Sequence, residues 1–308
     1  MHRRRALLPL FLAFGAVGCQ PAAPGSAALG LTQAQLAWGA GDGQVGLRPA
    51  FAEAQAQGPS AIALDGAGRA YVLDRLNRRV LRLGERAVAV AAAAPDHELL
   101  AVGPDGALAL YSPLRARVDL VDADGAAIGA LDVPRHIGVV TAVTLQRSRR
   151  VTVATALQER YVLGSPSFPL PLPVVLAAHV EGAVALADGR GATLRLDGGA
   201  LLLRIFGRAA RELRVATHAD AAMLVGADGD VACARTESLA PGATIEVERR
   251  VVCVDTATGA VRLDEALPAP GLYPPRTELA VGGGRVAVLT PTREGVAIAS
   301  FPLGGGGR

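Results

Sequence analysis

The feature that most constrains the fold is a turn signal that recurs about every 40 residues. Four of the Asp-Gly pairs in the chain begin at positions 65, 105, 188 and 228, which follow one another by 40, 83 and 40 residues. The middle interval spans two periods, and the polar stretch 146–149 stands where the missing turn is expected. Three glycines at 282–284 mark a sixth position. Strand-rich repeats of this length are typical of β-propeller blades.

The clearest unit, residues 58–83, contains three segments that predict strands. Residues 60–64 are almost wholly apolar, whereas residues 79–83 alternate Arg with apolar side chains. A continuous apolar run suits a strand buried on both faces, and alternation suits a strand with one solvated face. The strands therefore become more exposed along the unit, as they do from the axis of a propeller to its rim.

We predict an all-β fold, a six-bladed β-propeller over residues 31–303. Its innermost strands are expected near residues 60, 99, 141, 182, 221 and 277. A spare segment, 31–37, precedes the first unit, and the last unit has only three strands. We therefore expect the N-terminal strand to join the last blade, which closes the ring and leaves no free sheet edge. A β-sandwich, the competing all-β arrangement, would not require the repeat.

Part of the first unit resembles an NHL repeat. The matching positions are Pro59, 62–65, Gly68, 71–74 and 77–80, and the glycine-rich segment 38–46 looks like the entry to such a repeat. The resemblance is specific over residues 38–83 and faint elsewhere. It implies a propeller without deciding its activity, because propellers include both enzymes and binding modules.

The first nineteen residues resemble the export signal of a bacterial lipoprotein. Three arginines at 3–5 precede an uncharged run, 6–18, which fits a signal peptide and is too short to span a bilayer. Residues 16–19, Ala-Val-Gly-Cys, resemble a lipobox, which implies that Cys19 carries the lipid. A secreted protein cleaved near Gly18 is the alternative.

The chain is thus expected to have four parts. These are a signal peptide (1–18), a lipidated cysteine with a flexible Pro/Gly/Ala-rich tether (19–30), the propeller (31–303) and a disordered tail (304–308). Gln20 is not the Asp that, by resemblance, favours retention in the inner membrane. We therefore expect an outer-membrane anchor, with the domain facing the periplasm or the cell surface.

The exported domain is expected to be nearly neutral and monomeric. The chain has 31 basic residues, all Arg, against 28 acidic ones, and three of the arginines lie at 3–5. The remaining Arg-Arg pairs are scattered along the sequence. A nucleic-acid-binding protein would concentrate positive charge on one face, so we expect no nucleic-acid partner.

Cys233 and Cys253 are predicted to form a disulfide. In a hairpin centred on residue 243 they lie directly opposite each other, with Cβ atoms about 5 Å apart. Disulfides also persist in the compartments that exported proteins occupy. Two buried free thiols are the alternative, and two cysteines alone do not make a metal site.

The one constellation that suggests chemistry is a set of four histidines. They are His97, His136, His179 and His218, spaced by 39, 43 and 39 residues. Each precedes a predicted inner strand, so that all four would lie at one channel mouth and bind zinc or another transition metal. This arrangement would support a metal-dependent lyase or hydrolase, as in the amidating-lyase relatives of NHL propellers. However, when the repeats are aligned on their Asp-Gly turns, the histidine positions differ from one another by up to four residues. This difference favours ordinary loop histidines and no cofactor.

No other motif supports an enzyme. The chain lacks Lys for Schiff-base chemistry, and its single Asn77 and single Trp38 argue against lactonase-type and quinoprotein-type propellers. We therefore expect a binding or scaffold module of the cell envelope, with a protein or glycan partner; a structural part in a larger envelope assembly is a weaker alternative. The candidate contact loops are 113–115, 165–173, 238–244 and 268–275. The proline-rich stretches 168–173 and 268–275 are expected to be extended.

Overall fold

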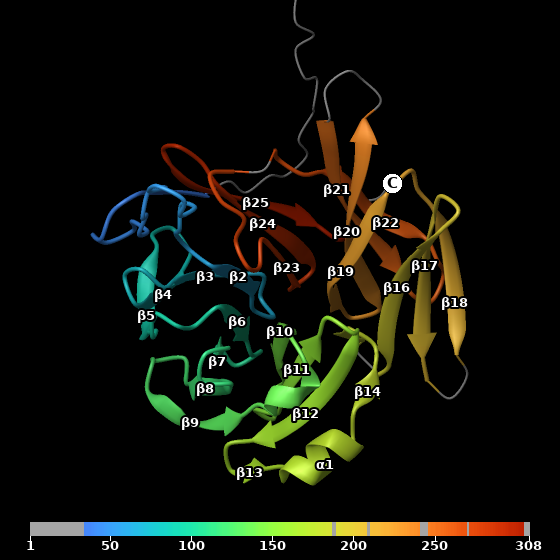
Figure 1. Ribbon diagram of the computed structural model, residues 1–308, viewed down its shortest axis with the longest axis horizontal. Coiled ribbons are helices and arrows are strands. Elements are labelled where there is room, and N and C mark those ends of the chain that lie inside the picture. The colour runs from blue at the N-terminus through green and yellow to red at the C-terminus, as the bar shows by residue number, and fades with distance from the viewer. Residues whose placement is uncertain (1–33, 187–188, 208–209, 241–245, 270, 305–308) are drawn as a thin grey trace, which may run out of the picture.

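A computed structural model describes residues 34–186, 189–207, 210–240, 246–269 and 271–304. Its strands form six small antiparallel sheets, and Figure 1 shows them arranged around a common centre. The fold is a six-bladed β-propeller, which confirms the prediction from the repeat. No helix in the described part of the chain is long and apolar enough to cross a bilayer.

Each blade has four strands in the order of the sequence, counted from the centre outward, and the last blade borrows its fourth. Blade 1 contains β2 (Ala61–Leu64), β3 (Ala70–Asp74), β4 (Arg79–Arg82) and β5 (Val88–Ala92). Blade 2 contains β6 (Leu99–Val102), β7 (Leu108–Ser112), β8 (Arg117–Val121) and β9 (Ala127–Asp132). Blade 3 contains β10 (Val140–Leu145), β11 (Val151–Thr155), β12 (Glu159–Ser165) and β13 (Phe168–Pro169), with β14 (Val180–Glu181) also paired to β12. Blade 4 contains β15 (Val184–Ala185), β16 (Gly191–Asp197), β17 (Ala200–Phe206) and β18 (Arg211–Ala216). Blade 5 contains β19 (Ala221–Asp228), β20 (Val231–Ala240), β21 (Glu246–Asp255) and β22 (Val261–Ala266). Blade 6 contains β23 (Leu279–Gly282), β24 (Arg285–Pro291), β25 (Gly295–Pro302) and β1 (Ala34–Ala37).

The N-terminal strand closes the ring, as predicted. β1 pairs antiparallel with β25, with Ala34 opposite Ile298 and Ala37 opposite Gly295. Leu36 is buried in the core between blades 6 and 1. Just beyond β1, the indole of Trp38 donates hydrogen bonds to the carbonyls of Thr292 and Arg293, each at 3.2 Å. Residues separated by more than 250 positions are thus joined, and the outer edge of the last blade is paired.

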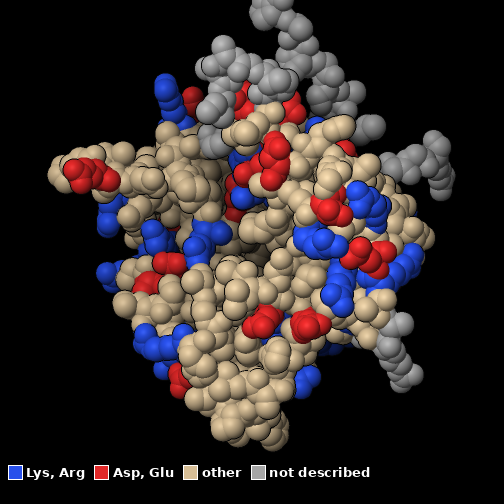
Figure 2. Space-filling model, turned by 45° about the vertical axis from the view of Figure 1, so that its right-hand side comes forward, with Lys and Arg blue, Asp and Glu red and all other residues tan. Residues whose placement is uncertain are grey.

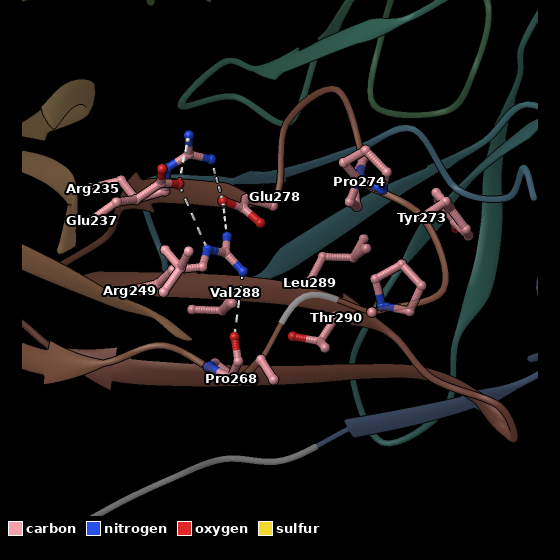
Figure 3. Close-up of a pocket in the computed structure, with 15 residues that line it drawn as sticks. Arg235, Glu237, Arg249, Pro268, Tyr273, Pro274, Glu278, Val288, Leu289 and Thr290 are labelled. Atoms are coloured by element: carbon pink, nitrogen blue, oxygen red, sulfur yellow. Dashed lines mark hydrogen bonds and ion pairs between the residues drawn. The ribbon is translucent and has the colours of Figure 1, made fainter. Parts of the chain in front are cut away.

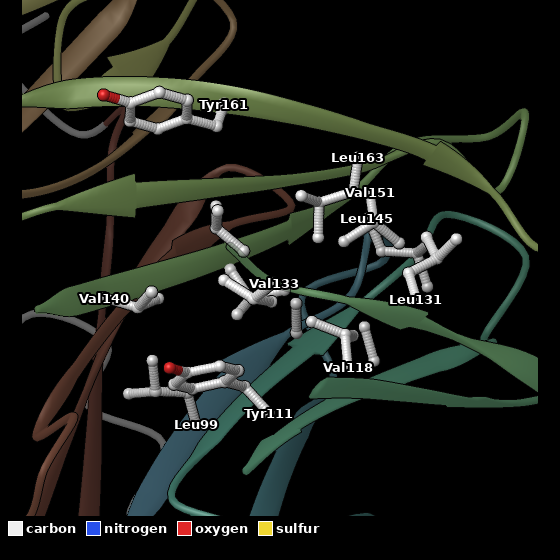
Figure 4. Packing of buried hydrophobic residues seen from close by; sticks show 14 of the residues in the cluster. Leu99, Tyr111, Val118, Leu131, Val133, Val140, Leu145, Val151, Tyr161 and Leu163 are labelled. Atoms are coloured by element: carbon white, nitrogen blue, oxygen red, sulfur yellow. The ribbon is translucent and has the colours of Figure 1, made fainter. Parts of the chain in front are cut away.

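The core consists of apolar layers between neighbouring blades. Strand β2 is buried along its whole length, as its continuous apolar sequence predicts, because it packs against blade 2 on one face and blade 6 on the other. Figure 4 shows the layer between blades 2 and 3, to which Leu99 and Tyr111 contribute from blade 2 and Val140 and Tyr161 from blade 3. These layers are built mainly from Ala, Val and Leu, which pack the sheets closely without many aromatic rings.

Residues that resemble an NHL repeat form a structural network in blade 1. The buried carboxylate of Asp74 accepts hydrogen bonds from the backbone of Gly46 and from the side chains of Asn77 and Arg79. The guanidinium of Arg79 also donates to the carbonyl oxygens of Gly41 and Gln44, each at 2.8 Å. The network therefore fixes the glycine-rich segment onto the second turn of the blade.

Blade 3 departs from the predicted pattern. Residues 168–173 were expected to be extended, but only β13 is a strand, and a short helix, α1 (Leu172–Ala177), begins within the stretch. A second short helix, η1 (Arg135–Ile137), lies between blades 2 and 3. Pro173 is compatible with the start of α1, because the first helical residues need no backbone donor.

Candidate functional site

The propeller has two faces, and the described connections between blades lie on one of them. We call this the connection face; it includes residues 55–60, 93–98, 133–139, 217–220, 267–269 and 271–278. Because neighbouring strands are antiparallel, the turns between the second and third strands lie on the same face. Strand β1 begins at Ala34, opposite Ile298 in the middle of β25, and runs toward the connection face. The described chain therefore enters the fold in the direction of the connections.

The four histidines lie in connections on this face, but the structure does not bring them together. His136, His179 and His218 are exposed, and His179 packs beside the ring of Tyr161 at 5.9 Å between centroids. Among the described residues, which include all four histidines, no three His, Cys, Asp or Glu side chains are grouped as metal ligands. The structure therefore does not group the predicted metal ligands, because equal spacing along the chain does not aim side chains toward the axis.

His97 instead belongs to a structural network within blade 2. Its Nδ1 accepts a hydrogen bond from the backbone of Ala94 at 2.9 Å, so the ring proton belongs on Nε2, which lies 2.9 Å from the carboxylate of Asp119. Arg115 joins Asp119 and Asp96 at 2.8 and 2.7 Å. Burial lowers the pKa of His97, in spite of the opposing effect of Asp119. A neutral imidazole that orders a turn is thus the role of this residue.

A groove on the connection face is the strongest candidate for a functional site. Two adjoining cavities of about 360 and 440 Å³ share the residues Tyr273, Pro274 and Pro275. The first lies between blades 5 and 6, and the second lies beside the entry to blade 1 at residues 55–60. Figure 2 shows a hollow near the middle of the molecule with basic and acidic groups around it. We call the two cavities together the groove.

The first cavity contains four charged side chains of balanced sign. Glu278 accepts hydrogen bonds from Arg249 and from Arg235, the latter at 2.6 Å, and Glu237 lies 3.3 Å from Arg235 (Figure 3). Burial opposes ionisation of Glu278, but the two arginines outweigh it and hold the pKa of Glu278 below its usual value. Arg249 also donates to the carbonyl of Pro268 at 3.3 Å, which attaches the proline-rich segment to the charged group.

Two glycines allow the proline-rich wall to approach its neighbours. A Cβ atom on Gly271 would lie 1.9 Å from the carbonyl oxygen of Pro291, and one on Gly58 would lie 2.2 Å from the hydroxyl of Tyr273. That hydroxyl donates to the carbonyl of Pro59 at 3.2 Å, and burial raises the pKa of Tyr273. The wall of the groove is therefore held by close backbone packing.

The second cavity carries further charged and polar groups. Arg276 lies 3.8 Å from Glu98, and Arg75 donates a hydrogen bond to Gln57 at 3.4 Å. These pairs are long and partly exposed, so the groups remain accessible to a ligand. Together, the two cavities offer hydrogen-bonding groups of both signs along one continuous wall.

The predicted contact loops are only partly involved. In loop 268–275, Pro268, Ala269 and Gly271 line the first cavity and residues 273–275 line both, whereas Arg115 in loop 113–115 serves the network of His97. Residues 241–244 of the loop 238–244 lie outside the described residues, as do the predicted signal peptide, Cys19 and the tether. Sequence reasoning missed Arg235, Arg249 and Glu278, since nothing in their spacing shows that they meet.

Cys233 and Cys253 lie directly opposite each other in the β20–β21 pair, as the hairpin centred on residue 243 predicts. Their sulfur atoms are 2.08 Å apart, the distance of a disulfide, and both residues are fully buried. They pack in the apolar layer between blades 5 and 6, below the arginines of the groove. The pair thus joins the two strands that carry Arg235 and Arg249.

Comparisons with known proteins identify no family for the chain. No family model matches the chain, and no curated protein matches it. Virginiamycin B lyase from Staphylococcus aureus is 10% identical with a TM-score of 0.41, and covers 88% of this chain and 99% of its own. U3-55K is 9% identical with a TM-score of 0.47, covering 83% and 98%.

A member of the DUF4221 family from Bacteroides vulgatus is 10% identical with a TM-score of 0.46, covering 79% of this chain and 93% of its own. At these identities and TM-scores, the solved structures transfer no activity to the chain. The structure itself shows a six-bladed β-propeller with a charged groove on its connection face.

Proposed function

We propose that the protein is an exported, NHL-like propeller lipoprotein that acts as a monomeric binding module of the cell envelope. Cys19 would carry the lipid, and the groove would bind a segment of a protein partner. The basic start, the uncharged run and the cysteine in the first nineteen residues support export and anchoring. Gln20 favours the outer membrane.

The direction of β1 supports the use of the connection face. Residues 20–33 separate the lipidated cysteine from Ala34, and a chain of this length reaches at most about 50 Å. β1 runs from Ala34 toward the connection face, so an anchor that precedes Ala34 leaves the connection face able to point away from the membrane. A partner in the periplasm or outside the cell would meet the groove first.

The observation that carries the proposal is a free strand edge beside the groove. Pairing of β21 to β22 begins at Arg250, and residues 246–248 have no strand partner on that side among the described residues. The carbonyl of Arg249 points to that side, because it accepts from the backbone of Leu267. In an antiparallel pair such groups alternate, so the backbone of Val247 faces the same open side.

A protein segment is the partner that this geometry fits best. An extended peptide can add to a free edge through backbone hydrogen bonds while its side chains enter neighbouring pockets. Val247 and Arg249 line the first cavity, so the free edge and the pocket belong to one surface. A metal-dependent lyase or hydrolase is not proposed, because the histidines that it would need are dispersed.

A photo-crosslinking experiment in intact cells tests the proposal. A photoreactive residue at Leu239, which lies opposite Val247 and is 59% exposed, should form an adduct with a discrete protein. The same residue at Val261, 48% exposed on β22, should form none. Val247→Pro should abolish the adduct because it removes the outward backbone donor, whereas Val247→Thr should preserve it.

Two results would contradict the proposal. Adducts at Leu239 that survive Val247→Pro would mean that no strand is added to the edge. Labelling of polysaccharide in place of protein would make a glycan the partner of this surface.

A further inference from the structure

The contact between blades 3 and 4 differs from the other contacts in the ring. Hydrophobic clusters join blades 1 and 2, 2 and 3, 4 and 5, 5 and 6, and 6 and 1. Among the described residues no such cluster joins blade 3 to blade 4. We call this contact the polar seam; it is formed by β12 and β14 of blade 3 and by β16 of blade 4.

Polar groups hold the described part of the seam. The amide of Gln158 accepts a hydrogen bond from the backbone of Leu194 at 2.9 Å and donates to its carbonyl at 3.0 Å. The backbone of Gly182 also donates to the carbonyl of Gln158. These bonds hold blade 3 to blade 4 where the other blade contacts have an apolar layer.

Arg160 lies in the seam as a buried cation without a partner. Its side chain is 6% exposed, and its Nε atom has no hydrogen-bond partner among the described residues. No ion pair to it occurs there either. Glu159 accepts from the hydroxyl of Tyr161 at 2.7 Å, and Glu181, across from Glu159 in the strand pair, is exposed. The nearest carboxylates along the strands therefore do not neutralise the guanidinium.

Glycine at position 191 allows a close approach at this point of the seam. A Cβ atom on Gly191 would lie 3.0 Å from Nη2 of Arg160 and 2.0 Å from the carbonyl oxygen of Glu181. The backbone of β16 therefore lies directly against both β14 and the end of the Arg160 side chain, and any side chain at position 191 would collide with them.

From this geometry we infer that the polar seam is a binding site for a small oxyanion, with Arg160 as its cationic ligand. An isolated buried charge is strongly disfavoured, whereas a guanidinium paired with a phosphate or carboxylate forms two parallel, charge-assisted hydrogen bonds. Burial, the only influence on the group, lowers the pKa of Arg160, in accord with a site that lacks a negative charge of its own. The inference is independent of the partner proposed for the groove.

Titration of the full-length protein with inorganic phosphate tests the inference. The midpoint of thermal unfolding is followed at constant ionic strength, with chloride replaced by phosphate, and calorimetry measures the stoichiometry. One saturable site should appear, with a rise of roughly 3–8 °C when phosphate exceeds its Kd about a hundredfold. A parallel titration with acetate tells whether a carboxylate, as carried by a peptide, replaces phosphate.

Arg160→Met should weaken phosphate binding at least about tenfold, since a hydrogen bond to a charged group is lost. The matched control is Arg195→Met, which removes a 63% exposed arginine from β16. It should bind phosphate as the unaltered protein does. In chloride, Arg160→Met should unfold at the same or a higher temperature, because it removes an unpaired buried charge.

The inference is overturned if phosphate and acetate produce no saturable change, since water would then solvate the guanidinium. It is also overturned if both variants respond equally to phosphate. If Arg160→Met does not fold, Arg160→Lys serves in its place, because it keeps the charge but loses the paired donors; a phosphate affinity in that variant equal to that of the unaltered protein would refute the assignment.

Discussion

The substitution Gly295→Ala should detach the strand that closes the ring. A Cβ atom at this position would lie 2.1 Å from the carbonyl oxygen of Leu36 and 3.1 Å from the Cα atom of Ala37. Both are backbone atoms of β1, so no side-chain rotation relieves the overlap, and β1 must move by about 1 Å or more. Such a shift breaks the pairing with β25.

The expected cost follows from the side chain that β1 buries. Leu36 is 5% exposed in the layer between blades 6 and 1, and truncation of a buried leucine to alanine costs about 2–5 kcal/mol. Gly295→Ala should cost at least as much as Leu36→Ala, because it displaces the whole strand. The two substitutions should not add: once β1 is detached, shortening Leu36 removes no further contact, and the double variant should be as stable as Gly295→Ala alone.

The single tryptophan of the chain makes this prediction measurable. Trp38 follows β1 directly and is held by two carbonyls of blade 6, so its fluorescence reports on the closure. Under native conditions Gly295→Ala should shift the emission of Trp38 to longer wavelength. Urea unfolding should show a lower free energy of unfolding than in the unaltered protein. Gly66→Ala is the control, because its nearest new contacts lie at 3.9 Å. Emission and stability equal to those of Gly66→Ala, or additive losses in the double variant, would refute the reasoning.

Three further predictions concern other parts of the molecule. Burial lowers the pKa of His97 in the folded protein, so on acidification the unfolded chain takes up a proton at this residue before the folded protein does. The free energy of unfolding should therefore fall as the pH drops below about 6.5, the pKa of histidine in the unfolded chain. Urea unfolding repeated at several pH values should show a weaker dependence on pH in His97→Gln. Replacing Cys233 and Cys253 by Ala should cost about 3 kcal/mol relative to the oxidised protein, and a reducing agent should destabilise the unaltered protein but not this variant; insensitivity of both to reduction would mean that the disulfide is absent. Cys19→Ala should prevent incorporation of labelled palmitate, and in detergent phase partitioning it should move the protein from the detergent phase to the aqueous phase. Labelled lipid retained in this variant would mean that another residue carries the lipid.

Local sequence signals were sufficient for the blade pattern. The Asp-Gly pair at 65–66 and the glycines at 282–284 stand at the turns between first and second strands, as expected. The predicted hairpin centre at residue 243 placed Cys233 opposite Cys253. Turn chemistry and strand periodicity act over a few residues, so they can be read without knowledge of distant contacts.

The candidate site could not be read in this way. The four histidines have the spacing of the repeat, yet their side chains point to local partners or to solvent, because a shift of one or a few residues in a connection redirects the side chain. Glu278 meets Arg235 and Arg249 from two other strands. Helix α1 was also missed, since its proline-rich start favours an extended chain when considered alone.

What the sequence by itself determined is the number of blades, the closing strand and the register of the long hairpin. The blades and the hairpin depend on periodicity and on turns within a short stretch of chain, and the closing strand followed from counting one spare strand at the N-terminus and one missing strand in the last unit. What only the tertiary structure decided is which charges face one another across blades, including the pairing of Glu278 and the unpaired state of Arg160. Those relations depend on how sheets distant in sequence pack around the ring. The twist and packing of the sheets set them, and no local pattern encodes that arrangement.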